Sequence, residues 1–308
     1  MSGILTPHEK IDMIYTWVDG SLPGYLEERQ KYSEKPIDMN PERYRDTFQN
    51  LRYSLRSVAT YLPWVNMIYI VTNRPQVPAW LDPDHPQIKI IHLDEFIPDA
   101  YLPTFCSNAI ESFLHLIPGL SEHFIYMCDD FFFLRETKLS HFWKDGTYAI
   151  LGTLIGENLK WRVYAEKNNI IGTGFVEHGP HFARKSYWKA MTEMRPVEME
   201  ATRRRKFRHP ENLVTFKLYR TYMLDQHRAI SRPVRFWTYT RFAIFVKLVN
   251  DLKKMRKALD RLRLRRPNFY CLNDDLQGDP NPEIVDLVRS FLAETYPKPS
   301  PFEFAEVS

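Results

Sequence analysis

The sequence predicts an α/β protein built on a doubly wound, mainly parallel sheet. Apolar, strand-like segments recur through about the first 130 residues, and segments with helical spacing lie between them. The strands are also almost continuously apolar. Alternating strands and helices are typical of parallel sheets, and strands that are apolar on both sides need helices on both faces of the sheet.

Each element follows from its own local pattern. The strand-like segments are residues 11–18, 66–72, 88–93 and 123–128. Apolar residues at helical spacing predict helices at 48–62 and 108–117, which end at Pro63 and at Pro118-Gly119. The second half is less regular and predicts a strand at 147–154, a loop or short strand at 267–275, and helices at 187–194, 212–226 and 282–294.

Composition narrows the class of protein. A chain of 308 residues that is 44% apolar is expected to form one large domain, or a domain with an appendage. The formal charge of +4 is too small to indicate a nucleic-acid binder, so no nucleic-acid partner is expected. The three cysteines are far apart, which argues against a disulfide framework or a cysteine zinc site and fits a reducing compartment.

Location is predicted from what the chain lacks. Residues 1–10 have no apolar signal core, and no run reaches the ~18 apolar residues of a spanning helix. We therefore expect a cytoplasmic protein, or one that is peripheral on the inner face of the cell membrane.

Residues 228–266 differ in composition from the rest. They contain thirteen Lys or Arg and two Asp. This predicts a basic, aromatic, helical insertion between two parts of a catalytic domain, 1–227 and 267–308. The segment could dock on an anionic membrane surface, cover an acceptor groove and bind an anionic phosphoglycan, or be a solvated helix pair. Its interleaved aromatic residues are Phe236, Trp237, Tyr239, Phe242 and Phe245.

The strongest chemical signal is Asp129-Asp130, directly after the apolar strand 123–128. Two carboxylates at the end of a buried strand are costly unless something neutralises them. That end of a strand is where ligands bind in open α/β sheets. A divalent cation with a phosphate ligand, Mg²⁺ or Mn²⁺, accounts for the pair, since hard cations combine one or two carboxylates with substrate phosphates. The alternative is a solvated Asp-Asp turn.

The first strand ends in a comparable way, with Trp17, Asp19 and Gly20. An aromatic ring and a carboxylate at a strand end suit a nucleotide, because the ring can stack on the base and the carboxylate can bind the base or ribose. A core Trp followed by a turn Asp is the commoner arrangement.

Three other clusters could contact phosphate or metal. His178 and His181 flank a Gly-Pro turn and could bind metal, transfer a proton or donate to phosphate, or could be surface structure. Arg208 lies in the cationic run 203–209, which suits a polyanion but could be a solvated helix end. Asn273 and Asp274 could complete a magnesium shell, or belong to a polar loop. Taken together, these groups are what phosphoryl transfer requires.

The same residues resemble the conserved segments of the Stealth proteins, in order, over about residues 11–275. The resemblance rests on residues 11–20; on 51–57, 64–72, 102–111, 117–121 and 129–131; on His178 and Pro180 with 207–209; and on 272–274. The family includes bacterial capsule polymerases and the lysosomal-enzyme N-acetylglucosamine-1-phosphotransferase.

The resemblance implies a GT-A-like fold and transfer of hexose-1-phosphate from a nucleotide-sugar donor, such as a UDP-sugar, to a sugar hydroxyl of a glycan acceptor. The product is a phosphodiester, made in capsule or exopolysaccharide synthesis, and a nucleoside monophosphate leaves. Two rivals remain: a metal-dependent glycosyltransferase that releases nucleoside diphosphate, and a non-catalytic module that binds phosphoglycans.

The resemblance also implies roles for particular residues. Magnesium would be held by Asp129 or Asp130 and by Asn273 or Asp274. Arg208 would stabilise charge on the transferred phosphoryl group, and either His178 or Asp130 would be the base. The expected donor-binding residues are Trp17, Asp19, Gly20, Arg52 and Arg56.

Two departures from the family pattern concern the acceptor. Asn50 stands where members often have Glu, and Cys128 stands where they often have Asn. A thiol cannot replace the hydrogen bonds of an amide well, so these departures bear on the identity of the acceptor rather than on the reaction class.

Overall fold

The structure, a computed structural model, describes residues 9–22, 24–33, 45–144, 147–153, 179–226, 228–234, 243–276 and 280–305. Its central sheet has the strand order β3 (Ile88–His92), β2 (Ile68–Thr72), β1 (Ile11–Thr16), β4 (His123–Cys128) and β8 (His181–Arg184). The first four strands are parallel, and β8 is antiparallel to β4. The α/β class with a mainly parallel sheet is confirmed.

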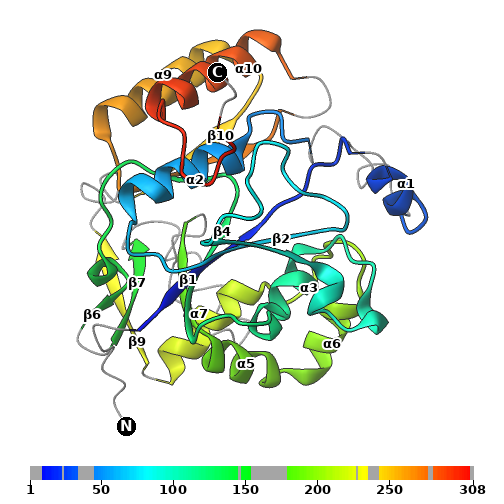
Figure 1. Ribbon diagram of the computed structural model, residues 1–308. Helices are drawn as coiled ribbons and strands as arrows, with labels where there is room; N and C mark the ends of the chain where they lie inside the picture. Colours follow the sequence, from blue (N-terminus) through cyan, green and yellow to red (C-terminus); the bar gives the residue numbers. More distant parts are fainter. Residues whose placement is uncertain are drawn as a thin grey trace.

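Helices cover both faces of this sheet (Figure 1). One face packs against α2 (Asn50–Tyr61), and the other against α3 (Ser107–Ser112), α5 (Lys185–Glu193), α6 (Pro196–Arg204) and α7 (Thr215–Asp225). Successive side chains of a strand point to opposite faces. Met13 and Tyr15 of β1 therefore join the core under α2, and Ile14 joins the core on the other side.

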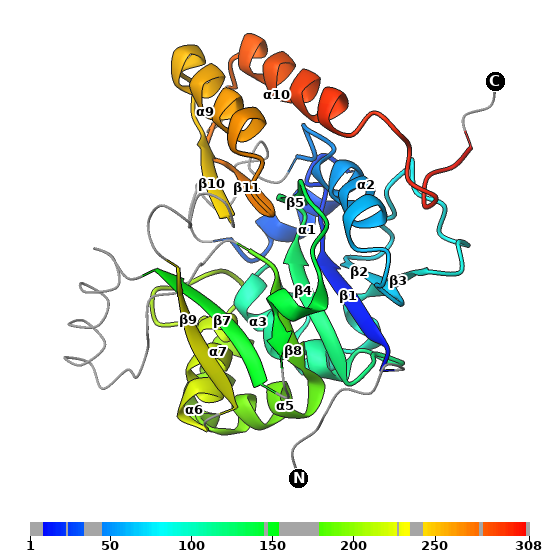
Figure 2. The ribbon, with the colours of Figure 1, turned by 90° about the vertical axis from the view of Figure 1, so that its left-hand side faces the viewer.

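Two three-stranded sheets flank the central one. The first has the order β10 (Ala243–Leu248), β11 (Phe269–Asp274), β5 (Phe131–Phe133), and the second has the order β6 (Trp143–Lys144), β7 (Thr147–Thr153), β9 (Ala229–Val234). Two helices, α9 (Leu252–Arg265) and α10 (Pro282–Thr295), pack on the first sheet and lie side by side at one end of the molecule (Figure 2). The short helix α1 (Tyr25–Gln30) follows β1.

The basic segment 228–266 is not a helical insertion, and this prediction is corrected. It contains the strands β9 and β10, only α9 is helical, and 235–242 lie outside the described residues. In β10, Ile244, Val246 and Leu248 are buried, whereas Phe245 is 43% exposed. An aromatic residue on the exposed side concealed the alternation that marks a strand. Nor is α9 separate from the remainder, because its buried side shares one core cluster with α10, β11 and β5.

Other boundaries shift by a few residues. The helix predicted at 108–117 divides into α3 and a 3₁₀ turn at Leu114–Leu116, while β8 and α6 were not predicted. No helix in the described ranges is both long and apolar enough to cross a bilayer.

Candidate active site

The candidate site lies at the carboxyl ends of β1 and β4. These neighbouring strands are aligned so that Thr16 is opposite Cys128. From β1 the chain builds β2 and β3 on one side of the sheet, whereas β4 joins on the other side. Ligands bind at such a point of reversal in open α/β sheets. Asp19 follows β1 and Asp129-Asp130 follows β4, so the fold brings these predicted carboxylates to one edge.

A third strand, β11, reaches Asp130 from the neighbouring sheet. Asn273 Nδ2 donates to Asp130 Oδ2 at 3.5 Å, and Cys271 Sγ donates to the same oxygen at 3.2 Å. The N–H of Leu272 donates to the Asp130 carbonyl at 3.0 Å. Residues 271 and 273 share one face of the strand, so Asp274 lies on the opposite face. The structure thus places Asn273 at Asp130, whereas Asp274 as a metal ligand stays a prediction.

Asp46 is an additional carboxylate at this edge. It precedes α2, and its side chain accepts hydrogen bonds from Trp17 Nε1 at 3.4 Å and from the Asn50 N–H at 3.1 Å. Burial raises the pKa of Asp46 to about 6, and the charge of Asp19 also raises it. The sequence carries no signal for Asp46, because the residue stands in a polar stretch without periodicity.

The pKa of Asp129 is shifted by burial and by the neighbouring carboxylates. Burial raises its pKa well above the usual value, and the charges of Asp130 and Asp46 raise it further. Carboxylates that destabilise one another's charged form are suited to a cation. In the described part of the chain, no group of three or more His, Cys, Asp or Glu side chains is placed to hold a metal ion by itself. The carboxylate and amide oxygens of Asp129, Asp130 and Asn273 are donors of the kind that a hard divalent cation combines with substrate phosphates.

Trp17 does not present a surface for a nucleotide base. Trp17 is 6% exposed and packs in the core under α2, so the predicted stacking role is wrong. Asp19, by contrast, is held in a rigid loop, since its N–H donates to Gln76 Oε1 at 3.0 Å and Gln76 Nε2 donates back to its carbonyl at 3.1 Å. Its carboxylate accepts from the Ser21 N–H at 2.9 Å, and Gly20 between them is buried.

Arg52 and Arg56 were predicted to bind the donor, but in the structure both side chains form ion pairs that connect α2 to the C-terminal segment. Both pair with Glu303 near the carboxyl end of the described chain, at 2.6 Å from Arg52 Nε and 2.7 Å from Arg56 Nη2. Arg56 Nη1 also donates to the Tyr296 carbonyl at 2.9 Å. Burial alone would raise the pKa of Glu303, but the hydrogen bonds from Arg56, Ser300 and Arg52 lower it to about 2. These arginines fasten the C-terminal segment onto α2.

A second polar group lies under the edge, on the α3 side of the sheet. Glu111 is 3% exposed and accepts a hydrogen bond from the Tyr126 hydroxyl at 3.1 Å. The hydroxyl is also 3.2 Å from Thr16 Oγ1, at the end of β1. Burial raises the pKa of Glu111 to about 7, and the positive charge of Arg208 opposes this increase. The Oε2 atom of Glu111 has no hydrogen-bond partner among the described residues.

Arg208 is exposed and reaches the first turn of α3, where its Nε donates to Ser107 Oγ at 2.9 Å. The structure therefore couples this predicted residue to Glu111, to which sequence reasoning had assigned no role. Helix α3 reads Ser-Asn-Ala-Ile-Glu-Ser, so its polar composition did not single out this glutamate.

An aromatic cluster holds the loop that carries Arg208. Phe207 stacks on Phe105 with ring centroids 5.4 Å apart. The guanidinium of the buried Arg29 lies 5.0 Å from the Phe207 ring and 5.1 Å from the Phe105 ring. A cation held between aromatic rings stabilises such an arrangement, so α1 and the two loops form one unit beside the site.

Of the two histidines, His181 lies within the described residues and His178 lies outside them. His181 starts β8 opposite Tyr126 of β4. Arg220 Nη2 is 2.7 Å from His181 Nδ1, and the imidazole stacks on Phe216 with centroids 4.8 Å apart. A guanidinium only donates, so Nδ1 is an acceptor and the ring is the neutral tautomer with its proton on Nε2.

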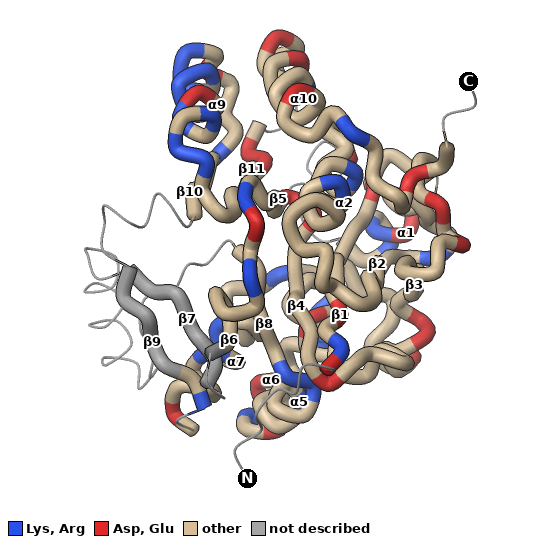
Figure 3. The backbone as a smooth tube through the Cα atoms, turned by 60° about the vertical axis from the view of Figure 1, so that its left-hand side comes forward, with Lys and Arg blue, Asp and Glu red and all other residues tan. Residues whose placement is uncertain are grey.

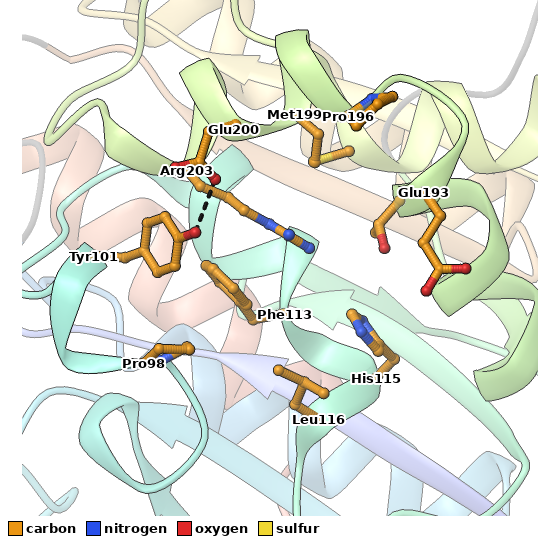
Figure 4. Close-up of a pocket in the computed structure, with 11 residues that line it drawn as sticks. Pro98, Tyr101, Phe113, His115, Leu116, Glu193, Pro196, Met199, Glu200 and Arg203 are labelled. Atoms are coloured by element: carbon orange, nitrogen blue, oxygen red, sulfur yellow. Dashed lines mark hydrogen bonds between the residues drawn. The ribbon is translucent and has the colours of Figure 1, made fainter.

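A pocket of about 440 Å³ lies elsewhere, between α5, α6 and the segment after α3 (Figure 4). Several of its polar groups are already bonded. Tyr101 donates to Glu200 at 2.8 Å, and Arg203 Nε donates to Ser112 Oγ at 3.0 Å. Burial lowers the pKa of His115 in its wall to about 4. The pocket adjoins the carboxyl end of α3, whereas Arg208 meets the amino end, so it is distinct from the candidate site.

Comparison with known proteins agrees with the order of the predicted segments. Residues 9–36, 43–150, 177–225 and 260–307 match the family models of Stealth protein conserved regions 1, 2, 3 and 4 respectively. The chain is 35% identical over 322 residues to an exopolysaccharide phosphotransferase of Streptomyces coelicolor, covering 95% of this chain and 51% of that protein.

Another relative is matched over more of its length. A capsular polysaccharide phosphotransferase of Haemophilus influenzae is 30% identical, covering 89% of this chain and 80% of the relative. Among solved structures, the galactosyltransferase LgtC in complex with donor and acceptor sugar analogs aligns with a TM-score of 0.46 at 10% identity, covering 92% of this chain and 96% of that one. The chain thus spans about half the length of the Streptomyces relative and about four fifths of the Haemophilus relative.

Proposed function

The chain belongs to the Stealth protein family, and we propose on that premise that it is a hexose-1-phosphotransferase of capsule or exopolysaccharide synthesis. The donor is a nucleotide sugar such as a UDP-sugar, and the acceptor is a glycan hydroxyl. The acceptor oxygen bonds to the phosphorus that bears the hexose. The bond from that phosphorus to the bridging oxygen breaks, so nucleoside monophosphate leaves and a phosphodiester forms.

The observation that carries this proposal is the meeting of three strands at Asp130. The ends of β1 and β4 and the face of β11 with Asn273 converge there, and Asp46 and Asp129 add carboxylates with raised pKa values. Phosphoryl transfer depends mainly on positioning and on neutralising charge, and this edge concentrates groups suited to both.

Mg²⁺ or Mn²⁺ is the cofactor that we propose for this edge. Asp129, Asp130 and Asn273 would hold it. When bound, the cation would neutralise charge on the donor diphosphate. Asp46 supports the site by taking hydrogen bonds from Trp17 and Asn50, which fixes the start of α2 against β1.

The remaining residues act on the transferred group and the acceptor. Arg208 is exposed at the amino end of α3 and presents its guanidinium fork to the phosphoryl oxygens. Glu111 sets the charge environment of that arginine from below. The base that takes the acceptor proton is Asp130 or His178. Asp19 and Gly20, in the loop fixed by Gln76, contact the nucleoside part of the donor.

The released nucleotide tests the proposal. The purified chain is incubated with a panel of nucleotide sugars and a glycan acceptor, and products are identified by mass. UMP and a phosphodiester-linked sugar are expected from a UDP-sugar. UDP with no phosphodiester would instead identify the metal-dependent glycosyltransferase, and glycan binding without any donor turnover would identify the non-catalytic module.

A further inference from the structure

One face of α9 carries a dense group of exposed basic side chains. Residues 253–266 contain eight Lys or Arg, all exposed, and one acidic residue, Asp260. In the backbone trace of Figure 3, Lys and Arg positions recur along the whole of α9, with apolar positions and one acidic position between them. We call this group the α9 basic face; it comprises Lys253, Lys254, Arg256, Lys257, Arg261, Arg263, Arg265 and Arg266.

Most of these charges are not neutralised by the described residues. Lys254 pairs with Asp251 at 3.3 Å, and Arg263 pairs with Asp260 at 3.1 Å and with Glu294 at 2.8 Å. The other six cations make no ion pair with any residue in the ranges that the structure describes. Their mutual repulsion is relieved when an anionic surface approaches.

An apolar residue stands in the middle of this face. Leu264 is 81% exposed, whereas Leu259 and Leu262 of the same helix are fully buried. At 100° per residue, Leu264 points away from the buried side and lies on the same side as Lys257 and Arg261. An exposed leucine among cations is typical of helices that lie in the headgroup region of a membrane.

Within the part of the chain that the structure describes, no segment covers this face of α9. Its inner side packs on α10 and on the sheet of β10 and β11, and the helix lies at the outer end of the molecule (Figures 1 and 2). Strand β11 of this sheet also brings Asn273 to Asp130. A surface bound to α9 would therefore have a defined position relative to the candidate active edge.

We propose that the α9 basic face docks the protein on a membrane surface that exposes anionic lipid headgroups, with Leu264 entering the headgroup layer. A soluble polyanionic glycan would use the same charges, but it has no apolar layer to receive Leu264. The outward-facing side of a helix also matches a flat surface better than a thin polymer. The inference goes beyond the proposed reaction and does not depend on it.

Co-sedimentation of the full chain with phosphatidylcholine vesicles, with and without phosphatidylglycerol, tests the proposal. Binding is expected to the anionic vesicles alone, and salt should weaken it. Each Lys or Arg near an anionic leaflet contributes roughly fivefold to partitioning. The combined variant Lys253→Gln, Lys257→Gln, Arg261→Gln, Arg265→Gln should therefore bind roughly a hundredfold more weakly or worse.

A matched control removes four exposed cations from elsewhere on the molecule: Lys138→Gln, Lys189→Gln, Arg195→Gln and Arg204→Gln. It has the same net charge and should keep nearly all of the binding. Leu264→Gln keeps every charge and should weaken vesicle binding roughly fivefold, while leaving binding to soluble polyphosphate unchanged. Thermal melts of all variants establish that they are folded.

Three results would overturn the proposal. The first is that the wild-type chain does not sediment with anionic vesicles at low salt. The second is that the control variant loses as much binding as the α9 variant, since bulk charge would then be the cause. The third is that Leu264→Gln binds vesicles as tightly as the wild type while soluble polyphosphate displaces the protein from the vesicles. That result would reassign the α9 basic face to a polyanionic glycan.

Discussion

The amide of Asn273 donates to the carboxylate of Asp130 at 3.5 Å, across 143 positions of the chain. The contact joins β11 to the end of β4. Asp274, the residue after Asn273, lies on the other face of β11, and its carboxylate accepts a hydrogen bond from the Leu276 N–H at 2.9 Å. Adjacent residues with similar side chains thus have different surroundings.

The first prediction is that substitutions at Asn273 and at Asp274 have different effects on activity. Asn273→Ala should lower kcat at least about tenfold, because Asp130 loses a donor that orients its carboxylate. Asp274→Asn keeps an acceptor for Leu276 and should retain most of the activity. Steady-state release of nucleoside monophosphate is the measurement. Equal losses of activity in the two variants would contradict the prediction that only the face of β11 with Asn273 serves the site.

The second prediction concerns the cation. Chelation by EDTA should abolish turnover, and added Mg²⁺ or Mn²⁺ should restore it. Asp129→Asn should raise the cation concentration needed for half-maximal rate and lower the maximal rate by about 100-fold or more, because a charged ligand is lost. Calorimetric titration with Mg²⁺ in the presence of donor checks binding independently. Full activity in EDTA would exclude the cofactor.

The third prediction concerns the guanidinium group of Arg208. Arg208→Lys keeps the positive charge but loses the planar fork, so kcat should fall about 100-fold while the melting temperature is unchanged. Ser107→Ala removes only the hydroxyl that accepts from Arg208 Nε, and a loss of about tenfold or less is expected. If Arg208→Lys turns over like the wild type, the arginine does not contact the transferred group.

The fourth prediction combines stability and activity at Glu111. Its pKa in the folded protein is about 7, raised from 4.5, so the folded state holds a proton between pH 4.5 and 7 that the unfolded state has released. Folding stability must then fall as pH rises through that window. Glu111→Gln should therefore be more stable than the wild type at pH 8, by up to about 3 kcal/mol, with no such advantage near pH 4.5.

The same variant should be much less active, because glutamine cannot supply the charge next to Arg208. The amide oxygen of the substituted side chain would still accept from Tyr126, so the packing is preserved. Melting temperatures at several pH values, together with kcat, test both parts. A variant that is less stable than the wild type at pH 8 would contradict the assignment of a raised pKa.

The fifth prediction concerns Glu303, whose pKa is lowered from 4.5 to about 2 in the folded protein. The stability it contributes is fully present above the unfolded pKa and is lost as pH falls towards 2. Glu303→Gln leaves the buried Arg56 without its charged partner and should cost about 3 kcal/mol at neutral pH. The activity per folded molecule and the donor KM should be unchanged.

Arg74→Gln is the matched control, since Arg74 forms an exposed pair with Asp94 at 3.0 Å. Its removal should leave the melting temperature nearly unchanged, because solvent screens an exposed ion pair. If donor KM rises in Arg52→Gln while stability is unaffected, the two arginines of α2 belong to the donor site after all.

The strands and the acidic pair could be predicted from the sequence because their signals are local. Apolar runs with short polar breaks specify β1, β2, β3 and β4, and a carboxylate pair that follows such a run must lie where the strand ends. The order of the Stealth segments is likewise a property of the chain alone. The strand β10 was not predicted, because Phe245 on its exposed face concealed the alternation of apolar and polar residues. The strand β9 was not predicted, because Ser-Arg-Pro interrupts its apolar residues.

Which side chains meet was decided by tertiary structure. Local pattern cannot say that Trp17 turns into the core, that Arg52 and Arg56 meet Glu303, or that Asp46 and Glu111 approach the strand ends. Each of these outcomes depends on the order of strands in the sheet and on the face to which a side chain points. The sequence alone therefore determined the types of chemical group available and the strands that carry them. Packing between distant segments determined which groups share one charged environment, because burial and neighbouring charges exist only once those segments have come together.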